Sequence, residues 1–156
     1  MVEVRTFQRS DQGTARELIE SGLGEHFGYV DANANPDLRD IDSSYLSLGH
    51  AFFVAEVSGQ LVGTTGMIIK PPEAQLVRVS VAKSHRRRGV ATRLLDRCLE
   101  YARQHQLSVL IAYTQPEWPD ALGFYLHHGF RVYGNDSIDV HLRRFVSVAR
   151  RFVSVA

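Results

Sequence analysis

The stretch LVRVSVAKSHRRRGVATRLLDRCLEYAR, residues 76–103, joins an alternating apolar run to an amphipathic run through three arginines and a glycine. Residues 75–81 alternate as a β-strand does, and the run that starts near Gly89 has the spacing of an α-helix. The apolar face of this helix collects Leu94, Leu95, Cys98, Leu99 and Ala102. The sequence therefore predicts a strand that leads through the arginines into a helix N-terminus.

The predicted junction favours an anion. The first backbone N–H groups of a helix have no partner within it, and the helix dipole adds partial positive charge there. Cations are unfavourable at the N-terminus of a helix unless an anion binds beside them. Gly89 and Ala91 are small and allow phosphate oxygens to approach the backbone. A solvated basic surface is the alternative. The Walker A and Gly-x-Gly-x-x-Gly nucleotide motifs are both absent.

Outward from this stretch, periodicity predicts an α/β (α+β) chain in the order β-α-α-β-β-β-α-β-α-β-β. This fold class is a mixed, mostly antiparallel twisted sheet flanked by helices. The expected strands are residues 2–7, 51–57, 61–70, 75–81, 108–113, 130–134 and 137–145. The expected helices are residues 10–23, a short helix after Asn35-Pro36, and residues 91–105 and 118–129.

Composition limits the class of protein. The 156 residues have the length of one domain and a formal charge of only +1, without the excess of cations that nucleic-acid binders usually carry. Residues 1–60 hold ten acids and four arginines, a charge of −6, so the remainder carries +7. One cysteine excludes an internal disulfide, and no run approaches the roughly 18 apolar residues of a membrane span. We expect a cytoplasmic protein that binds neither nucleic acid nor membrane.

The C-terminus repeats RRFVSVA in tandem, at residues 143–149 and 150–156. The repeat is too short for a solenoid unit, which needs roughly 20 residues or more. We expect a single domain over residues 1–142, followed by a duplicated tail whose second copy is artefactual or disordered. Alternatively, the second copy pairs with another chain at a sheet edge. A homodimer is a related possibility.

Arg86-x-x-Gly89-x-Ala91 resembles the [Gln/Arg]-x-x-Gly-x-[Gly/Ala] signature of the GNAT superfamily of N-acetyltransferases. The run LVRVSV is similar to the central strand of that family, and ALGFYLHHGF, residues 121–130, resembles its A-x-x-x-Y-x-x-x-G-F block. The resemblance covers roughly residues 1–142. Residues 76–103 are also faintly similar to camello-type acetyltransferases, whose hydrophobic membrane segment is missing here.

The resemblance implies an acetyl-CoA-dependent N-acetyltransferase. It places the pantetheine arm along Val79, Ser80 and Val81, where a backbone N–H near Val79 polarises the thioester carbonyl. It makes Tyr125 the acid that protonates the leaving thiolate; the alternative is a tyrosine of the core. The pyrophosphate is assigned to Arg86, Arg87, Arg88, Gly89, Val90, Ala91 and Thr92.

The general base and the acceptor are less well specified. Many family members have a glutamate where Gln75 stands, and Glu73 is expected to lie in a loop after two prolines. The acceptor is expected to be a primary amine of a small molecule or peptide, cationic because residues 25–42 are acidic. Candidate acceptor-site residues are His26, Tyr29, Asp31 and Tyr113. The alternative for residues 25–42 is a solvated loop.

Other functions remain open. A non-catalytic acyl-CoA sensor would keep the arginine loop and lose the chemistry, a nucleic-acid module would need aromatic residues among the cations, and a protein-interaction module would use the repeated tail. Cys98 lies on the apolar helix face, so burial is expected instead of nucleophilic catalysis. His127 and His128 lack companion ligands at zinc spacing, and no metal is expected.

Overall fold

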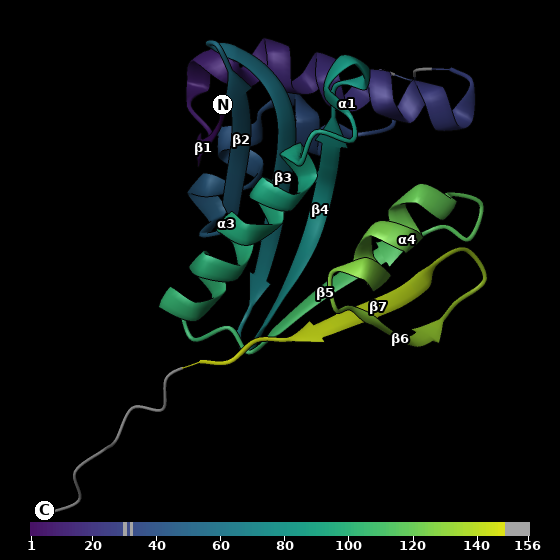
Figure 1. The fold of residues 1–156 in the computed structure, drawn as a ribbon. Coiled ribbons are helices and arrows are strands. Elements are labelled where there is room, and N and C mark those ends of the chain that lie inside the picture. The colour runs from purple at the N-terminus through teal and green to yellow at the C-terminus, as the bar shows by residue number, and fades with distance from the viewer. Residues whose placement is uncertain (30, 32, 149–156) are drawn as a thin grey trace, which may run out of the picture. The chain divides into compact units, whose positions relative to one another are not determined.

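The computed structural model describes residues 1–29, 31 and 33–148. Contacts divide the chain into two compact units, one comprising Met1–Ile69 with Gln75–Cys98 and the other Lys70–Ala74 with the chain from Leu99 onward. Strands and α-helices follow one another in the predicted order, with short 3₁₀ helices between some of them (Figure 1). The predicted fold class, a mixed, mostly antiparallel sheet flanked by helices, is confirmed.

The first unit is built on four strands in the spatial order β1-β2-β3-β4. They comprise Val2–Thr6, Ala51–Val57, Gln60–Lys70 and Glu73–Val81, respectively. The pairs β1/β2 and β2/β3 are antiparallel, and β2 and β3 form the predicted hairpin around Ser58-Gly59. The helices are α1 (Gln12–Phe27), α2 (Ile41–Ser44) and α3 (Val90–Gln104), of which α3 continues into the second unit.

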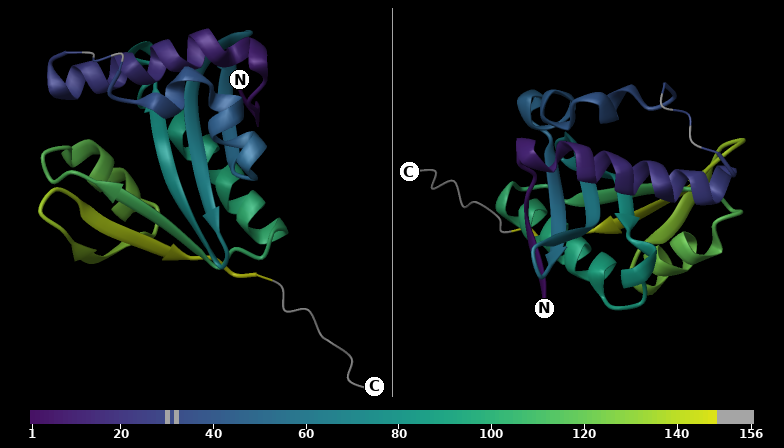
Figure 2. Two further views of the ribbon diagram at one scale, coloured as in Figure 1. Left: turned by 180° about the vertical axis from the view of Figure 1, so that it is seen from behind. Right: turned by 90° about the horizontal axis from the view of Figure 1, so that it is seen from above.

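Helices cover both faces of this sheet because its strands are apolar on both sides. Phe52 and Val54 of β2 pack into a buried cluster with Ile19 of α1 and Ile41 of α2. The ring of Phe53, on the opposite side of β2, lies 4.7 Å from the guanidinium carbon of Arg97 in α3. Figure 2 accordingly shows α1 and α2 on one face and α3 on the other.

The N-terminal turn of α3 packs closely on β3 at Gly63. A Cβ built on Gly63 would lie 2.8 Å from Cγ1 of Val90 and 3.0 Å from Cδ1 of Leu94. Both distances are shorter than ordinary van der Waals contact, so a larger residue would displace the helix start. The predicted apolar face of α3 is confirmed, since Leu94, Leu95, Cys98, Leu99 and Ala102 are all buried.

The second unit contains β5 (Val109–Thr114), α4 (Pro119–His127), β6 (Arg131–Asn135) and β7 (Val140–Phe145). Its strands have the order β5-β7-β6, and both pairs are antiparallel. Leu110, Ala112 and Leu142 are fully buried within it. Their neighbours Tyr113 and Phe145, on the alternate face of the strands, are exposed.

One segment that was expected to be a loop belongs to a strand. Strand β4 begins at Glu73, so the assignment of Glu73 to a loop is wrong: the chain is already extended directly after Pro72. Strand β7 begins at Val140 instead of residue 137 and ends at Phe145 as predicted, so residues 143–145 of the first RRFVSVA copy lie in the sheet. The backbone N–H of Val146 then donates to the Ser108 carbonyl. The second copy, residues 150–156, lies outside the described residues.

Candidate functional site

The backbone of β4 is irregular at Arg78, where φ is +53° inside a nine-residue strand. Such a conformation is rare for any residue other than glycine and costs of order 1–3 kcal/mol. The guanidinium is fixed in place: its Nε and Nη2 donate to the Asp37 carboxylate at 2.9 and 2.6 Å, and Nη2 also donates to Oδ1 of Asn35 at 3.2 Å. The Arg78 carbonyl accepts a hydrogen bond from Oγ1 of Thr64 at 2.8 Å. Hydrogen bonds thus fix both the side chain and the carbonyl group of Arg78.

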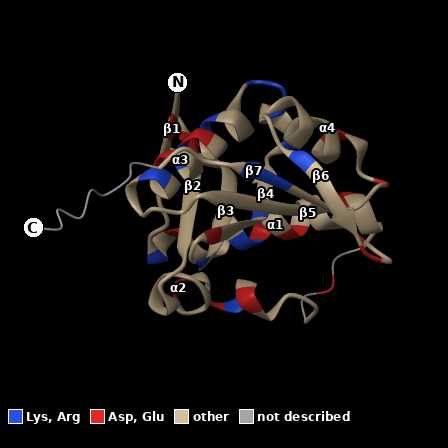
Figure 3. Cartoon of the chain, turned by 90° about the horizontal axis from the view of Figure 1, so that it is seen from below, with Lys and Arg blue, Asp and Glu red and all other residues tan. Residues whose placement is uncertain are grey.

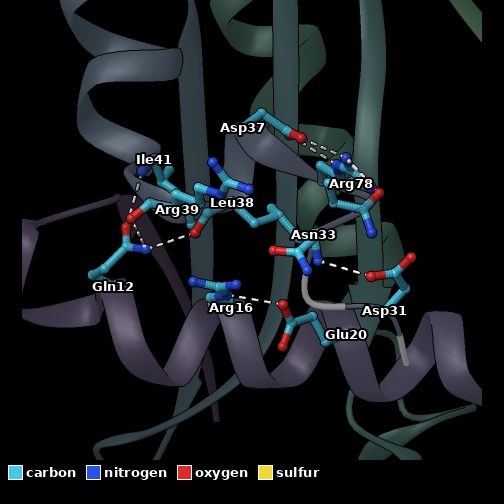
Figure 4. Close-up of polar contacts among 11 residues, drawn as sticks. Gln12, Arg16, Glu20, Asp31, Asn33, Asp37, Leu38, Arg39, Ile41 and Arg78 are labelled. Atoms are coloured by element: carbon cyan, nitrogen blue, oxygen red, sulfur yellow. Dashed lines mark hydrogen bonds and ion pairs between the residues drawn. The ribbon is translucent and has the colours of Figure 1, made fainter. Parts of the chain in front are cut away.

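Asp37 is the centre of a partly buried network. Besides Arg78, it accepts a 2.6 Å hydrogen bond from the Tyr45 hydroxyl. Burial opposes the charge of Asp37, but the bonds from Arg78 and Tyr45 outweigh it and lower the pKa of this carboxyl. Burial, and then the bond to Asp37, raises the pKa of Tyr45. Figure 4 shows the Asp37 carboxylate pointing toward the guanidinium of Arg78.

After Arg78 the strand presents the three residues to which the family resemblance assigned the pantetheine arm. Val79 is 37% exposed, which is unusual for valine in a strand of a packed sheet. Ser80 and Val81 are half-buried. Helix α1 approaches the strand closely here, since a Cβ on Gly22 would lie 3.1 Å from Oγ of Ser80.

The predicted junction between β4 and α3 is confirmed. The helix begins at Val90, and its first backbone bond runs from the Arg93 N–H to the Gly89 carbonyl. Gly89 has φ +80°, and a Cβ placed on it would contact nothing within 4 Å. Arg87 also has a positive φ, +62°. This loop therefore turns sharply and leaves open space beside its backbone at the start of the helix.

The three arginines of the loop are not equivalent. Arg87 and Arg88 are exposed, and no ion pair joins either to another described residue. Arg86 instead donates from Nη1 and Nη2 to the Glu25 carboxylate of α1 at 2.7 and 3.1 Å, and from Nε to the Val81 carbonyl at 3.1 Å. The bond from Arg86 lowers the pKa of Glu25. Arg86 thus ties the loop to α1 and to the end of β4.

Two of the predicted acceptor-site residues come together in the first unit. Tyr29 and Asp31 line a cavity of about 230 Å³ with Glu20, Leu23 and Phe27 of α1. His26 is exposed and is not among the described residues that line it. Figure 4 shows the Asn33 backbone N–H donating to the Asp31 carboxylate, and Arg16 donating to the Glu20 carboxylate.

The remaining candidates belong to the second unit. Tyr125 is buried in α4, 7% exposed, with its ring edge-to-face against Phe130 at 5.2 Å. Tyr113 is 43% exposed and stacks on His141 at 4.2 Å. Burial, and then a hydrogen bond with Tyr113, raises the pKa of Tyr133 to about 12. Tyr113 therefore belongs to an aromatic cluster on the open face of β5 and β7.

Other residues from the sequence analysis are structural. Cys98 is fully buried, as predicted, and burial raises the pKa of its thiol to about 12. Within residues 1–29, 31 and 33–148, no three His, Cys, Asp or Glu side chains gather where they could hold a metal ion. The helices of the same residues are each too short or too polar to cross a bilayer.

The sequence analysis missed the Arg78–Asp37–Tyr45 network. The one available signal was an arginine inside an apolar strand, which predicts a buried partner. Nothing in the sequence marks the positive φ, because glycine is the residue that usually signals it.

Comparison with known proteins agrees with this geometry. The model of the acetyltransferase (GNAT) family matches residues 14–130, which come from both units. Rat N-acetyltransferase 8 is 35% identical over 119 residues, which cover 72% of this chain and 54% of the relative. Human N-acetyltransferase 8B is 34% identical over 122 residues, which cover 74% of this chain and 54% of the relative. The chain thus spans about half the length of these curated relatives, which are camello-like.

Solved structures show the same fold. A GNAT-family acetyltransferase from Staphylococcus aureus Mu50 superimposes with a TM-score of 0.86 at 23% identity, covering 94% of this chain and all of the other. The PaiA N-acetyltransferase of Thermoplasma acidophilum, solved in complex with coenzyme A, gives 0.81 at 17% identity, covering 93% and 99%. The predicted family is confirmed: the chain belongs to the GNAT acetyltransferases.

Proposed function

We propose that this protein is an acetyl-CoA-dependent N-acetyltransferase that transfers the acetyl group directly to a primary amine of a small molecule or peptide. The loop from Arg86 to the start of α3 carries this proposal, because it combines open space at Gly89 with two exposed arginines at a helix N-terminus. Membership of the GNAT family supports it, as does the coenzyme A bound by the Thermoplasma neighbour. We further propose that residues 1–142 act as one catalytic domain.

The residues of the loop fit a pyrophosphate. The first N–H groups of α3 have no partner within the helix by geometry, and the side chain absent at Gly89 leaves room for phosphate oxygens against the backbone. Arg87 and Arg88 would supply the compensating charge. Arg86, which holds Glu25 and the Val81 carbonyl, would position the loop.

The conformation at Arg78 suits the chemistry expected at Val79. A positive φ in a strand turns the following peptide group out of the regular pattern of the sheet, and the Val79 N–H follows Arg78 directly. In the proposed reaction the amine nitrogen bonds to the acetyl carbon, the C–S bond breaks, and the amine's proton ends on the sulfur. The Val79 N–H would stabilise the charge that develops on the carbonyl oxygen.

Tyr125 is the proposed proton donor. A phenol with a pKa of about 10 is a suitable acid for a thiolate whose conjugate pKa is about 8.5. We expect Tyr125→Phe to lower kcat by roughly 100-fold with little change in acetyl-CoA affinity. Tyr101→Phe, a matched change on α3, should leave kcat unchanged. Normal turnover in Tyr125→Phe would make the tyrosine a packing residue only.

The test of the function itself combines two measurements. Calorimetric titration with acetyl-CoA and CoA measures binding, and thiol release with a panel of primary amines measures transfer. We expect saturable acetyl-CoA binding and amine-dependent thiol release. Binding without release would identify a non-catalytic acyl-CoA-binding protein, and absence of binding would refute both.

A further inference from the structure

The cavity at the C-terminal end of α1 has chemistry that limits what it can bind. Its volume of about 230 Å³ is below the roughly 300–1,000 Å³ of pockets for drug-sized ligands. At the roughly 30 Å³ that a water molecule occupies in the liquid, the space equals seven or eight waters. It therefore fits a small molecule and not a folded peptide.

The lining of the cavity is apolar with two carboxylates. Leu23, Phe27 and Tyr29 provide the apolar surface, and Asp31 provides the charge, because the charge of Glu20 is compensated by its ion pair with Arg16. Neither lysine nor arginine is among the described residues that line it. A ligand that combines an apolar group with one ammonium matches this surface, and a ligand carboxylate would face the like charge of Asp31 without a cation in the lining to compensate it.

Each of the two carboxylates is held in place by a hydrogen bond to one of its two oxygens. Oε1 of Glu20 accepts from Nε of Arg16 at 2.8 Å, and Oδ1 of Asp31 accepts from the Asn33 N–H at 2.9 Å. Because a carboxylate offers about four acceptor positions, further positions on each group can accept from an ammonium, which has three donors. Figure 4 shows these two contacts beside each other.

The cavity is linked to the irregular part of β4. Asn35 lines the cavity, and its Oδ1 accepts the hydrogen bond from Arg78 described above. Arg78 immediately precedes Val79, the proposed thioester site. All of these residues belong to the first unit, so one compact body carries both the cavity and the strand.

We propose that this cavity binds the body of the acceptor, and that the acceptor is a small primary amine with an apolar, preferably aromatic, group and no carboxylate. The inference rests on the proposed acetyltransferase function, but the binding of an amine to the cavity can be measured without acetyl-CoA. The ammonium would lie beside Asp31, and the apolar group would pack on Leu23 and Phe27.

The experiment compares three ligands of one skeleton: 2-phenylethylamine, its carboxylated analogue L-phenylalanine, and 2-phenylethanol, which lacks the charge. Their dissociation constants are measured by ligand-observed NMR on the full chain, with and without CoA. We expect 2-phenylethylamine to bind at least tenfold more tightly than either analogue in both conditions. Equal or tighter binding of L-phenylalanine, or no binding of the amine, would overturn the proposal.

Variants locate the binding. Asp31→Asn should weaken 2-phenylethylamine about tenfold and leave 2-phenylethanol unchanged, whereas Phe27→Ala should weaken both; each replaced side chain is exposed enough for the fold to persist. Glu17→Gln, an exposed carboxylate on α1 outside the cavity, is the matched control and should change neither. Wild-type affinity in both test variants would place the amine elsewhere. Failure of CoA to bind would refute the proposed function while leaving the amine measurement interpretable.

Discussion

The loop before α3 and the segment from Glu25 to Asp42 carry opposite charge in the sequence, and the structure treats these charges differently. The loop leaves Arg87 and Arg88 exposed without ion pairs to described residues. Arginines from outside the acidic segment neutralise much of its charge, because Glu25 pairs with Arg86, Asp37 with Arg78 and Asp42 with Arg9. Acidic and basic stretches follow one another along the segment that leads into α2 (Figure 3). Charge counted along the sequence therefore overstates the field of the acidic segment.

The comparison also changes the interpretation of specificity. A broad negative field would favour any cationic amine, polyamines included. Carboxylates that already bind arginines contribute little to such a field, and Glu20 is among them through Arg16, so the selective part is the local cavity at Asp31, which joins no ion pair with a described residue. Substitutions in the loop and in the ion pairs, and titrations at different salt concentrations, test the difference between the exposed arginines of the loop and the paired carboxylates of the acidic segment.

The largest effect is expected at the loop. Gly89→Glu places an anion in the open space beside the helix N-terminus and should weaken acetyl-CoA binding at least 100-fold, measured by calorimetry. Gly59→Glu is a matched control, since Gly59 also has a positive φ, +77°, and open space at its Cβ, but lies in the β2–β3 turn. Unchanged affinity in Gly89→Glu would remove the pyrophosphate from this loop.

The next effect concerns the pairs of the acidic segment. Asp37→Asn leaves the partly buried guanidinium of Arg78 without its charge partner and should cost about 3 kcal/mol of unfolding free energy. Asp42→Asn breaks a pair whose arginine is 87% exposed and should cost less than about 1 kcal/mol. Urea denaturation measures both. Equal losses would contradict the distinction between the structural pair and the surface pair.

The Asp37 contribution should depend on pH in a defined direction. Because its pKa is lower in the folded protein, its stabilising effect is fully present above the unfolded value of about 3.9 and is lost as pH falls from that value through the lower folded pKa. The stability difference between the wild type and Asp37→Asn should therefore be full at pH 7 and shrink below about pH 4. A difference that stays constant to pH 3 would mean that packing, and not charge, supplies it.

The parts of the fold that depend on local pattern were predictable from the sequence. Alternation, helical spacing and, for β5, a continuous apolar run predicted the strands and the longer helices, the Asn35-Pro36 pair predicted the short helix, and the loop at Gly89 followed from small residues and cations at a helix start. The hydrogen bonds of Asp37 and Arg86 were not predictable, because they join residues 41 and 61 positions apart. Charge alone could not distinguish Arg86, which binds Glu25, from Arg87, which is exposed.

The candidate site was predictable to the same extent. Tyr29 and Asp31 were chosen from an irregular polar segment and do share a cavity, whereas Glu20 and Leu23 were assigned to the helix expected over residues 10–23, and Phe27, in the polar segment after it, was not singled out. Periodicity identifies which face of a helix is apolar. It does not show which part of that face lies open to a ligand.

A smaller effect is expected for the exposed arginines. Replacing Arg87 and Arg88 together with glutamine should weaken acetyl-CoA about tenfold, because two charge-assisted contacts to phosphate are lost in a solvated position. The affinity of the double variant should also depend less steeply on salt concentration than that of the wild type. Titrations at two ionic strengths measure both quantities. A parallel salt dependence in the two proteins would show that neither arginine contacts the phosphates.

The smallest effect is expected for the ion pair between Arg86 of the loop and Glu25 of the acidic segment. The Arg86–Glu25 pair is 41% and 36% exposed, so Glu25→Gln should change the unfolding free energy by less than about 1 kcal/mol. If Arg86 only positions the loop, acetyl-CoA affinity in this variant should change less than about threefold. A gain of tenfold or more would have a different meaning: Arg86 would then be a phosphate ligand that Glu25 holds back, and all three arginines would belong to the co-substrate site. Combining Glu25→Gln with Arg86→Gln separates the two cases, because a positioning pair gives the double variant nearly the affinity of either single variant.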